Sequence, residues 1–183
     1  FNSKYDNYSY MYYSNSEVKT TLKSWYQTNI GSKADLAKNV ASGAYYCEQA
    51  KVKRNSSWTS ESANMTLYSS YTPDFKCTTD GNEKGQISAS AGLLTYDEIV
   101  YAGGYYGKSN SNYYLYNSAI YWWTMSTAGF SISGSYVWYV DVADIISYTN
   151  VYNTRAVRPV LNLTADTQIS DGDGTKENPF VVS

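Results

Sequence analysis

The chain has 183 residues, 22 tyrosines, no histidine, a formal net charge of −2 and a mean hydropathy of −0.49. The length fits a single domain, the near-neutral charge excludes a strongly basic nucleic-acid surface, and no apolar run is long enough for direct membrane insertion. Without histidine, the chain itself cannot form a Ser-His-Asp triad, a Cys-His dyad or a His-ligated metal site.

The first quarter of the chain predicts two consecutive amphipathic helices. Within residues 17–30, apolar side chains recur at helical spacing, and Gly31 follows as a glycine that ends the helix. Ser32 is expected to be the N-cap of the second helix, with Asp35 in its first turn and Gly43 at its end.

The middle of the chain predicts mostly loop with a few short elements. Residues 44–47 are expected to form a short strand, whereas residues 48–92 are polar and weakly periodic. Thr95 and Glu98 form the pattern of a capping box, which predicts a short helix that glycine ends at Gly103.

The C-terminal part predicts strands and turns. The expected strands are 119–125, 136–140, 156–163 and 179–182, with a turn at 171–174. Helices followed by strands predict an α+β fold, with two N-terminal helices packed on a mostly antiparallel, strand-rich half, in one domain over residues 1–183. We expect Trp122 and Trp123 in the core. Arg158, a lone charge in an apolar strand, is expected to be paired inside the fold.

The two cysteines, Cys47 and Cys77, are an even count. A disulfide between them would close a loop of about 30 residues and add about 3–4 kcal/mol, while two buried free thiols are the alternative. A surface rich in Ser, Thr, Asn, Tyr and Gly and poor in Lys favours an extracellular location over a cytosolic enzyme.

Residues 126–156 contain no Lys, Glu, Gln or Met, although the rest of the chain contains all four. Strands and turns deplete some of these residues, which is the ordinary explanation. A second explanation comes from the genetic code: replacing the adenines of the Asn codons AAC and AAT yields Asn, Tyr, Ser, Asp, Thr, Ala and others, but never Lys, Glu, Gln, Met or Trp. Trp138, inside the apolar run 137–140, is the only residue of the window that this route cannot produce.

Several segments resemble one protein family from gut-associated bacteria and their phages. They are YWWTMS (121–126), YVWYV (136–140), VRPVLNL (157–163), DGDGTKENPF (171–180), LKSWY (22–26) and LTYDEIVYAGG (94–104). The resemblance implies a C-type-lectin fold, related to formylglycine-generating-enzyme-like domains. Several members are variable proteins of diversity-generating retroelements, whose C-terminal positions are mutated at template adenines.

The resemblance and the depleted window together imply a variable ligand-binding region at residues 126–155. Tyr offers large, rigid contact area, and Ser, Gly and Asn adapt around it, as in antibody paratopes. The expected ligand contacts are Phe130, Ser131, Ser133, Ser135, Tyr136, Asp141, Ala143, Asp144, Ser147, Tyr148, Asn150, Tyr152, Asn153 and Arg155. The expected partner is a protein or other surface macromolecule, and the expected location is a cell or virion surface.

Neither a cofactor nor catalysis is expected. The Glu-Pro-Asn or Gln-Pro-Asp loop of calcium-dependent C-type lectins is missing, and Asp171 and Asp173 do not fit the spacing of a calcium loop. The alternatives are a fixed adhesin or carbohydrate-binding module of the same fold, and an enzyme related to cysteine oxidases. The enzyme would need Cys47 or Cys77 to be reactive, in a chain with no histidine and no third cysteine.

Overall fold

The computed structural model describes residues 1–48, 73, 75, 77, 85–113, 115, 119–143, 145–175 and 177–183. The helical elements are η1 (Tyr8–Met11), η2 (Tyr13–Asn15), α1 (Glu17–Tyr26), the π-helix η3 (Gln27–Gly31), α2 (Ala34–Ala37) and α3 (Tyr96–Tyr101). The strands are β1 (Ala44–Cys47), β2 (Gln86–Ala89), β3 (Tyr105–Tyr106), β4 (Trp122–Ser131), β5 (Gly134–Val140), β6 (Ile145–Asn150), β7 (Ile169–Asp171) and β8 (Val181–Val182). The fold is therefore α+β, with mostly antiparallel sheets.

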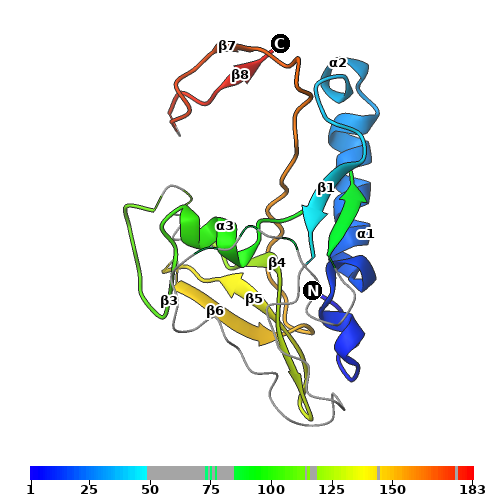
Figure 1. Ribbon diagram of the computed structural model, residues 1–183, viewed down its shortest axis with the longest axis vertical. Helices are drawn as coiled ribbons and strands as arrows, with labels where there is room; N and C mark the ends of the chain where they lie inside the picture. Colours follow the sequence, from blue (N-terminus) through cyan, green and yellow to red (C-terminus); the bar gives the residue numbers. More distant parts are fainter. Residues whose placement is uncertain are drawn as a thin grey trace.

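The largest sheet among the described residues has four strands in the order β3–β6–β5–β4 and forms the lower part of the molecule in Figure 1. β4, β5 and β6 are antiparallel neighbours, and β3 pairs parallel with β6. Trp138 lies opposite Tyr148, and the next residue, Tyr139, lies opposite Ser147. Because side chains alternate along a strand, these two pairs lie on opposite faces of the sheet.

The face that carries Trp138 packs against α3, which covers it in Figure 1. The Trp138 ring lies 4.8 Å from that of Tyr96 in α3 and 5.7 Å from that of Tyr106 in β3, measured between centroids. Trp122 and Trp138 are both completely buried in this core. Tryptophan and tyrosine thus provide the buried area that the small number of leucines does not.

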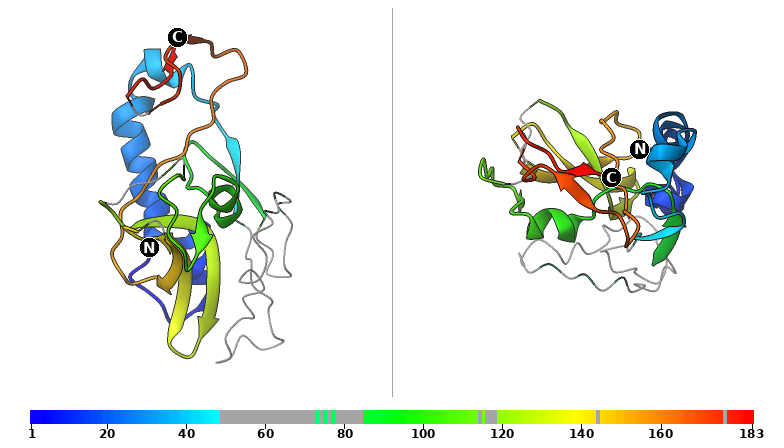
Figure 2. Two further views of the ribbon diagram at one scale, coloured as in Figure 1. Left: turned by 90° about the vertical axis from the view of Figure 1, so that its left-hand side faces the viewer. Right: turned by 90° about the horizontal axis from the view of Figure 1, so that it is seen from above.

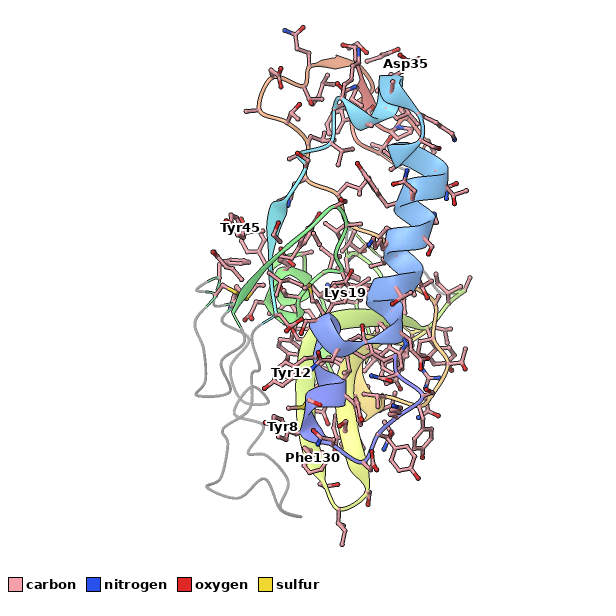
Figure 3. The ribbon with its side chains drawn as sticks, turned by 90° about the vertical axis from the view of Figure 1, so that its right-hand side faces the viewer. Tyr8, Tyr12, Lys19, Asp35, Tyr45 and Phe130 are labelled. Carbon is pink, nitrogen blue, oxygen red and sulfur yellow. A yellow bond between two sulfur atoms is a disulfide. The ribbon has the colours of Figure 1, made fainter. Side chains whose placement is uncertain are left out.

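The opposite face packs against the N-terminal segment. Figure 3 shows Tyr8 and Tyr12 of this segment beside the β4–β5 hairpin, with Phe130 toward the end of the hairpin. Tyr12 is completely buried in the second core, together with Trp123. α1 joins this core through Val18 and Leu22, in its first two turns.

The second predicted helix is wrong in its cap and its extent. α2 has only four residues, none of them buried, and its N-cap is Lys33, which makes no side-chain cap bond. Ser32 has helical backbone angles because it ends the π-helix η3, and its hydroxyl donates to the carbonyl of Thr28 at 3.3 Å. It therefore cannot adopt the extended backbone that an N-cap needs.

The predicted strand 156–163 is also wrong, because this segment pairs only at single points with three separate parts of the chain. Its isolated bridges are Ala156 with Trp122, Val160 with Gly92 and Leu163 with Val40. Pro159 in its middle has no N–H to donate, which interrupts a continuous ladder. The segment runs as an extended connection along the molecule and leads to β7, as Figure 1 shows.

Two strands in the depleted window differ from the sequence prediction. β4 continues past residue 125 to Ser131, with Thr127 and Ala128 completely buried. The sequence pattern predicts no strand at 145–150, which lies in the region expected to vary, whereas the structure forms β6 there. Ile146 and Asn150 are buried along this strand, so it belongs to the sheet and its core.

The capping box is confirmed. The hydroxyl of Thr95 accepts from the backbone N–H of Glu98 at 3.2 Å, and the carboxylate of Glu98 accepts from the backbone N–H of Thr95 at 2.7 Å. α3 ends shortly before Gly103, which has a φ of +103°. β1 lies where a strand was predicted, at 44–47, and Trp122 and Trp123 are both in the core.

A disulfide joins Cys47, at the end of β1, to Cys77. The next residue, Glu48, is completely buried, and its carboxylate accepts hydrogen bonds from the N–H and the hydroxyl of Ser14. Burial raises the pKa of the nearby Tyr13 hydroxyl well above its usual range, and Tyr46 and Glu48 raise it further. These contacts fix β1 against the N-terminal segment.

Arg158 has no carboxylate partner among its described contacts. Its guanidinium lies over the ring of Trp122 at 5.2 Å and donates to the carbonyl of Leu115 at 2.9 Å. The predicted pairing of this charge thus takes the form of an aromatic face and a carbonyl oxygen.

The end of the molecule away from the four-stranded sheet carries α2 and the β7–β8 hairpin (Figures 1 and 2). Both hairpin strands are exposed along their whole length. The predicted turn at 171–174 lies at the start of the segment between them, with positive φ at Gly172 and Gly174. None of the described helices has the length and apolar character needed to cross a bilayer.

Candidate ligand-binding site

The structure does not bring the predicted ligand contacts together on one surface. Tyr136 and Tyr148 lie on the α3 face of the four-stranded sheet, whereas Arg155 lies over Tyr139 on the opposite face. Asp144 lies outside the described residues. The predicted set therefore divides into residues that hold the fold, residues on the α3 face and residues around a pocket on the other face.

Ser135 and Asn150 are structural, which corrects the prediction that they contact ligand. Ser135 is completely buried and donates from its hydroxyl to the carbonyl of Asn7. The buried Asn150 amide donates to the carbonyl of Ser133 at 2.8 Å, and this bond ties the end of β6 to the β4–β5 turn. Gly134 in that turn has a φ of +115°, and a Cβ there would lie 2.8 Å from the Asn150 amide.

Other predicted contacts shape turns. The carboxylate of Asp141 accepts from the N–H groups of Ala143 and Ile145 at 2.8 and 3.1 Å, which closes the β5–β6 turn. The hydroxyl of Ser131 accepts from the N–H of Ser133 at the end of the β4–β5 hairpin. These side chains are partly accessible, but their polar atoms already hold the backbone.

On the α3 face, Tyr136 and Tyr148 form an aromatic pair at the sheet surface. Their rings meet edge to face at 6.1 Å, and Tyr148 also contacts the buried Trp138 at 5.6 Å. Tyr148 is 37% exposed. This pair offers aromatic contact area at the surface of the sheet.

On the opposite face lies a pocket of about 430 Å³, which we call the Arg155 pocket. It is lined by Phe1, Asn2, Ser3, Glu17, Val18, Thr21, Trp123, Tyr152, Asn153, Thr154, Arg155 and Val157. The buried side chains of Phe1, Val18 and Trp123 form an apolar floor, and exposed polar residues form the rim. Concave sites with an apolar base and a few polar groups are the usual form of ligand pockets.

Arg155 is held at this pocket by two aromatic rings. Its guanidinium lies 5.0 Å from the ring centroid of Tyr121 and 4.7 Å from that of Tyr139. One guanidinium nitrogen donates to the carbonyl of Thr154 at 2.7 Å, while the buried Nε has no hydrogen-bond partner among the described residues. The rings fix the orientation of the charge, and the guanidinium has further N–H groups besides the one that donates to Thr154.

Tyr152 and Asn153 stand beside Arg155 in the segment after β6. Tyr152 is 55% exposed, and its ring meets that of Tyr5 edge to face at 5.2 Å. The Asn153 amide donates to the hydroxyl of Thr149 at 2.7 Å, which fixes the side chain and leaves its carbonyl oxygen as an acceptor. Three of the predicted contacts therefore lie together here.

The wall opposite this segment comes from the first turn of α1, and sequence reasoning missed it. Glu17 follows the N-cap Ser16 and accepts from the N–H and the hydroxyl of Ser3. These hydrogen bonds, first that of the Ser3 hydroxyl and then that of its N–H, lower the pKa of Glu17. In sequence, Glu17 looks like any acidic residue in a first helical turn, so no signal marked it as part of a site.

The N-terminal segment joins the two walls. The backbone N of Asn2 donates to the carbonyl of Val151 at 2.9 Å, and the N–H of Val18 donates to the carbonyl of Phe1 at 3.4 Å. The Phe1 ring packs edge to face on Trp123 at 5.5 Å. The pocket thus exists only because three segments distant in sequence meet over Trp123.

A smaller pocket of about 200 Å³ lies beside the disulfide and includes Tyr45, Phe75, Thr95 and Glu98 in its lining. Glu98 is engaged in the capping box, and the two cysteines are bonded to each other. Within the part of the chain that the structure describes, no group of His, Cys, Asp or Glu is arranged to hold a metal ion.

Comparison with known proteins adds no assignment: no family model matches the chain, and neither a curated protein nor a solved structure matches it.

Proposed function

We propose that this chain is a non-enzymatic ligand-binding domain of the C-type-lectin fold, displayed outside the cell and diversified by a retroelement. Its ligand is a protein or another surface macromolecule. The support from the sequence is the depleted window 126–156 and the resemblance of the flanking segments to the variable-protein family. The support from the structure is that residues 152–155, near the end of that window, line the Arg155 pocket.

One observation carries the proposal. Tyr152, Asn153, Thr154 and Arg155 are consecutive, are all reachable from Asn codons, and all line the Arg155 pocket. The other walls come from 1–3 and α1, outside the depleted window. A fixed scaffold that presents a short run of exchangeable residues at a concavity is what a diversified binder needs, because contacts then change without loss of the fold.

Burial indicates which positions of the window could vary without disturbing the fold. Ser135, Thr127 and Asn150 are buried and polar, and their replacement would disturb the hairpin and the cores. Variation should therefore concentrate at accessible positions, above all in 152–155 and at Tyr148.

The test is to sequence this locus from several isolates, together with any nearby repeat that could serve as its template. We expect the codons of Tyr152, Asn153 and Arg155 to differ between isolates at positions where the template has adenine. The codons of Trp123, Glu17 and Leu22 should stay constant. Identical 141–155 segments in all isolates, or variation spread evenly over the chain, would favour the fixed adhesin instead.

A further inference from the structure

The Arg155 pocket places the guanidinium of Arg155 and the carboxylate of Glu17 over an apolar floor, while the amino group of Phe1 donates to the carbonyl of Val151 at 2.8 Å and has its pKa lowered by burial to about 5. Arg155 comes from the segment after β6, and Glu17 comes from α1. Neither neutralises the other by a direct ion pair among the described contacts. The pocket therefore has a positive and a negative side, and a ligand must satisfy both.

After their hydrogen bonds within the protein are counted, Arg155 still has donors and Glu17 still has an acceptor. Arg155 uses one nitrogen for the carbonyl of Thr154 and retains donors. Glu17 accepts both of its bonds from Ser3 on Oε1, so that Oε2 remains an acceptor. The ligand group must accept on the Arg155 side and donate on the Glu17 side.

We propose that the Arg155 pocket receives an uncharged carboxamide, the side chain of a Gln or Asn presented by a loop of a protein ligand. Its carbonyl oxygen accepts from Arg155, and its NH₂ donates to Glu17. A carboxylate can accept from Arg155 but has no donor for Glu17, and an ammonium group can donate to Glu17 but has no acceptor for Arg155, whereas the amide satisfies both groups without a net charge. The inference rests on the proposed function, since it names the group by which such a ligand is anchored.

The surroundings fit a side chain of this kind. The apolar floor of Val18 and Trp123 accommodates the methylene groups of the side chain, and the exposed ring of Tyr152 at the rim can cover the adjoining main chain. Inserted side chains that fill a pocket and exclude water carry most of the free energy of many protein interfaces.

The experiment uses small probes that isolate the chemistry of the group. N-acetyl-glutamine N-methylamide is titrated into the ¹⁵N-labelled chain, and the resonances of Asn153, Thr154 and the Arg155 Nε–H are followed. Parallel titrations use the matching glutamate and lysine compounds and methyl glucoside. For the amide probe we expect a dissociation constant of about 10 mM, and roughly fivefold weaker binding of each charged probe.

Two variants, each of which removes one charge of the pocket, should each raise the affinity of a different charged probe. Glu17→Gln removes the repulsion of the carboxylate, so the glutamate probe should then bind at least as tightly as the amide probe. Arg155→Gln should give the same gain to the lysine probe and weaken the amide probe. Tyr101→Ser, at an exposed position of α3 on the other side of the sheet, is the matched control and should change none of these affinities.

Three results would overturn the carboxamide assignment. They are a wild-type preference for the glutamate or lysine probe, tighter binding of methyl glucoside than of the amide, and no shift of pocket resonances with the amide probe. Each leaves the proposed function standing, because variation of the locus is measured separately. Conversely, an invariant locus with a carboxamide-specific pocket would reject diversification alone.

Discussion

The β4–β5 hairpin and the segment 151–155 share one unusual composition, yet they have opposite places in the fold. The hairpin contributes Trp122, Trp138 and Val140 to the buried cores, whereas the segment after β6 lines a pocket on the surface. From residue 126 on, the hairpin and the segment both lack Lys, Glu, Gln and Met, whereas Met125 of β4 lies just before this depleted window. Strand formation explains the depletion in the hairpin, whereas the segment forms no strand.

This difference teaches where a compositional signal can be used. The depletion marks a region, but it does not separate side chains that support a surface from those that form it. Burial makes that separation: Ser135 and Asn150 have the same chemistry as Thr154, and only Thr154 is accessible. Four predictions test the comparison, in order of decreasing effect.

The largest effect is expected in the hairpin, from Trp138→Ala. The ring is completely buried and contacts Tyr96, Tyr106 and Tyr148. Its removal leaves a cavity and should lower the free energy of unfolding by about 3–5 kcal/mol, as measured by urea denaturation. A loss below 1 kcal/mol would show that the hairpin is not part of the core.

The second effect concerns Tyr13, in the core beneath the hairpin. Its buried hydroxyl donates to the carbonyl of Ala91 at 3.0 Å, so Tyr13→Phe should cost about 1–2 kcal/mol at neutral pH. Because burial raises the pKa of Tyr13, the folded state keeps this proton at a pH where the unfolded state loses it. Stability should therefore fall as the pH rises above about 10.

The Phe variant lacks this ionisation and should lose less stability between pH 9 and about 11 than the wild type does. Parallel pH profiles of the two proteins, recorded by urea denaturation, measure the difference. Profiles that stay parallel through this range would contradict a raised pKa at Tyr13.

The third prediction probes the boundary between the two regions. Asn150→Ala removes the bond to the carbonyl of Ser133, and the loss should be about 1 kcal/mol. Asn150→Asp loses this donor and places a buried negative charge against the carbonyl of Ser133, so it should be at least as destabilising. If both substitutions leave the free energy of unfolding unchanged, Asn150 is as exchangeable as the pocket residues, and burial does not separate structural from exchangeable positions.

The smallest effect is expected at the pocket itself. Tyr152 is more than half exposed, so Tyr152→Ser should change the free energy of unfolding by less than about 0.5 kcal/mol. Its contact with Tyr5 is at the surface and contributes little to the fold. A cost above 2 kcal/mol would mean that this residue supports the fold rather than presenting a ligand surface.

Local signals in the sequence were sufficient for local structure. The capping box at Thr95 and Glu98, the strand at 44–47 and the buried pair Trp122–Trp123 could all be predicted, because each depends on neighbours within a few residues or on size and polarity. Ser32 shows the limit even here. Its N-cap pattern was overridden by the π-helical turn that precedes it.

The site was predicted in part. Tyr152, Asn153 and Arg155 were predicted from the depleted window together with the family resemblance, and they line the Arg155 pocket. Glu17 and Ser3 could not be named, because nothing along the chain shows that the start of α1 meets residues more than a hundred positions later. Ser135 and Asn150 have the polar side chains expected of ligand contacts, but both side chains are buried.

The sequence by itself determined the α+β class, the dependence of the cores on tyrosine and tryptophan, the absence of histidine chemistry and the region of unusual composition. These follow from residue identity and short-range pattern. Only the tertiary structure decided which polar residues are buried, which face of the sheet each side chain occupies, and that Arg155 and Glu17 share a pocket. Those properties depend on strand register and on contacts between distant segments, which a linear pattern does not encode.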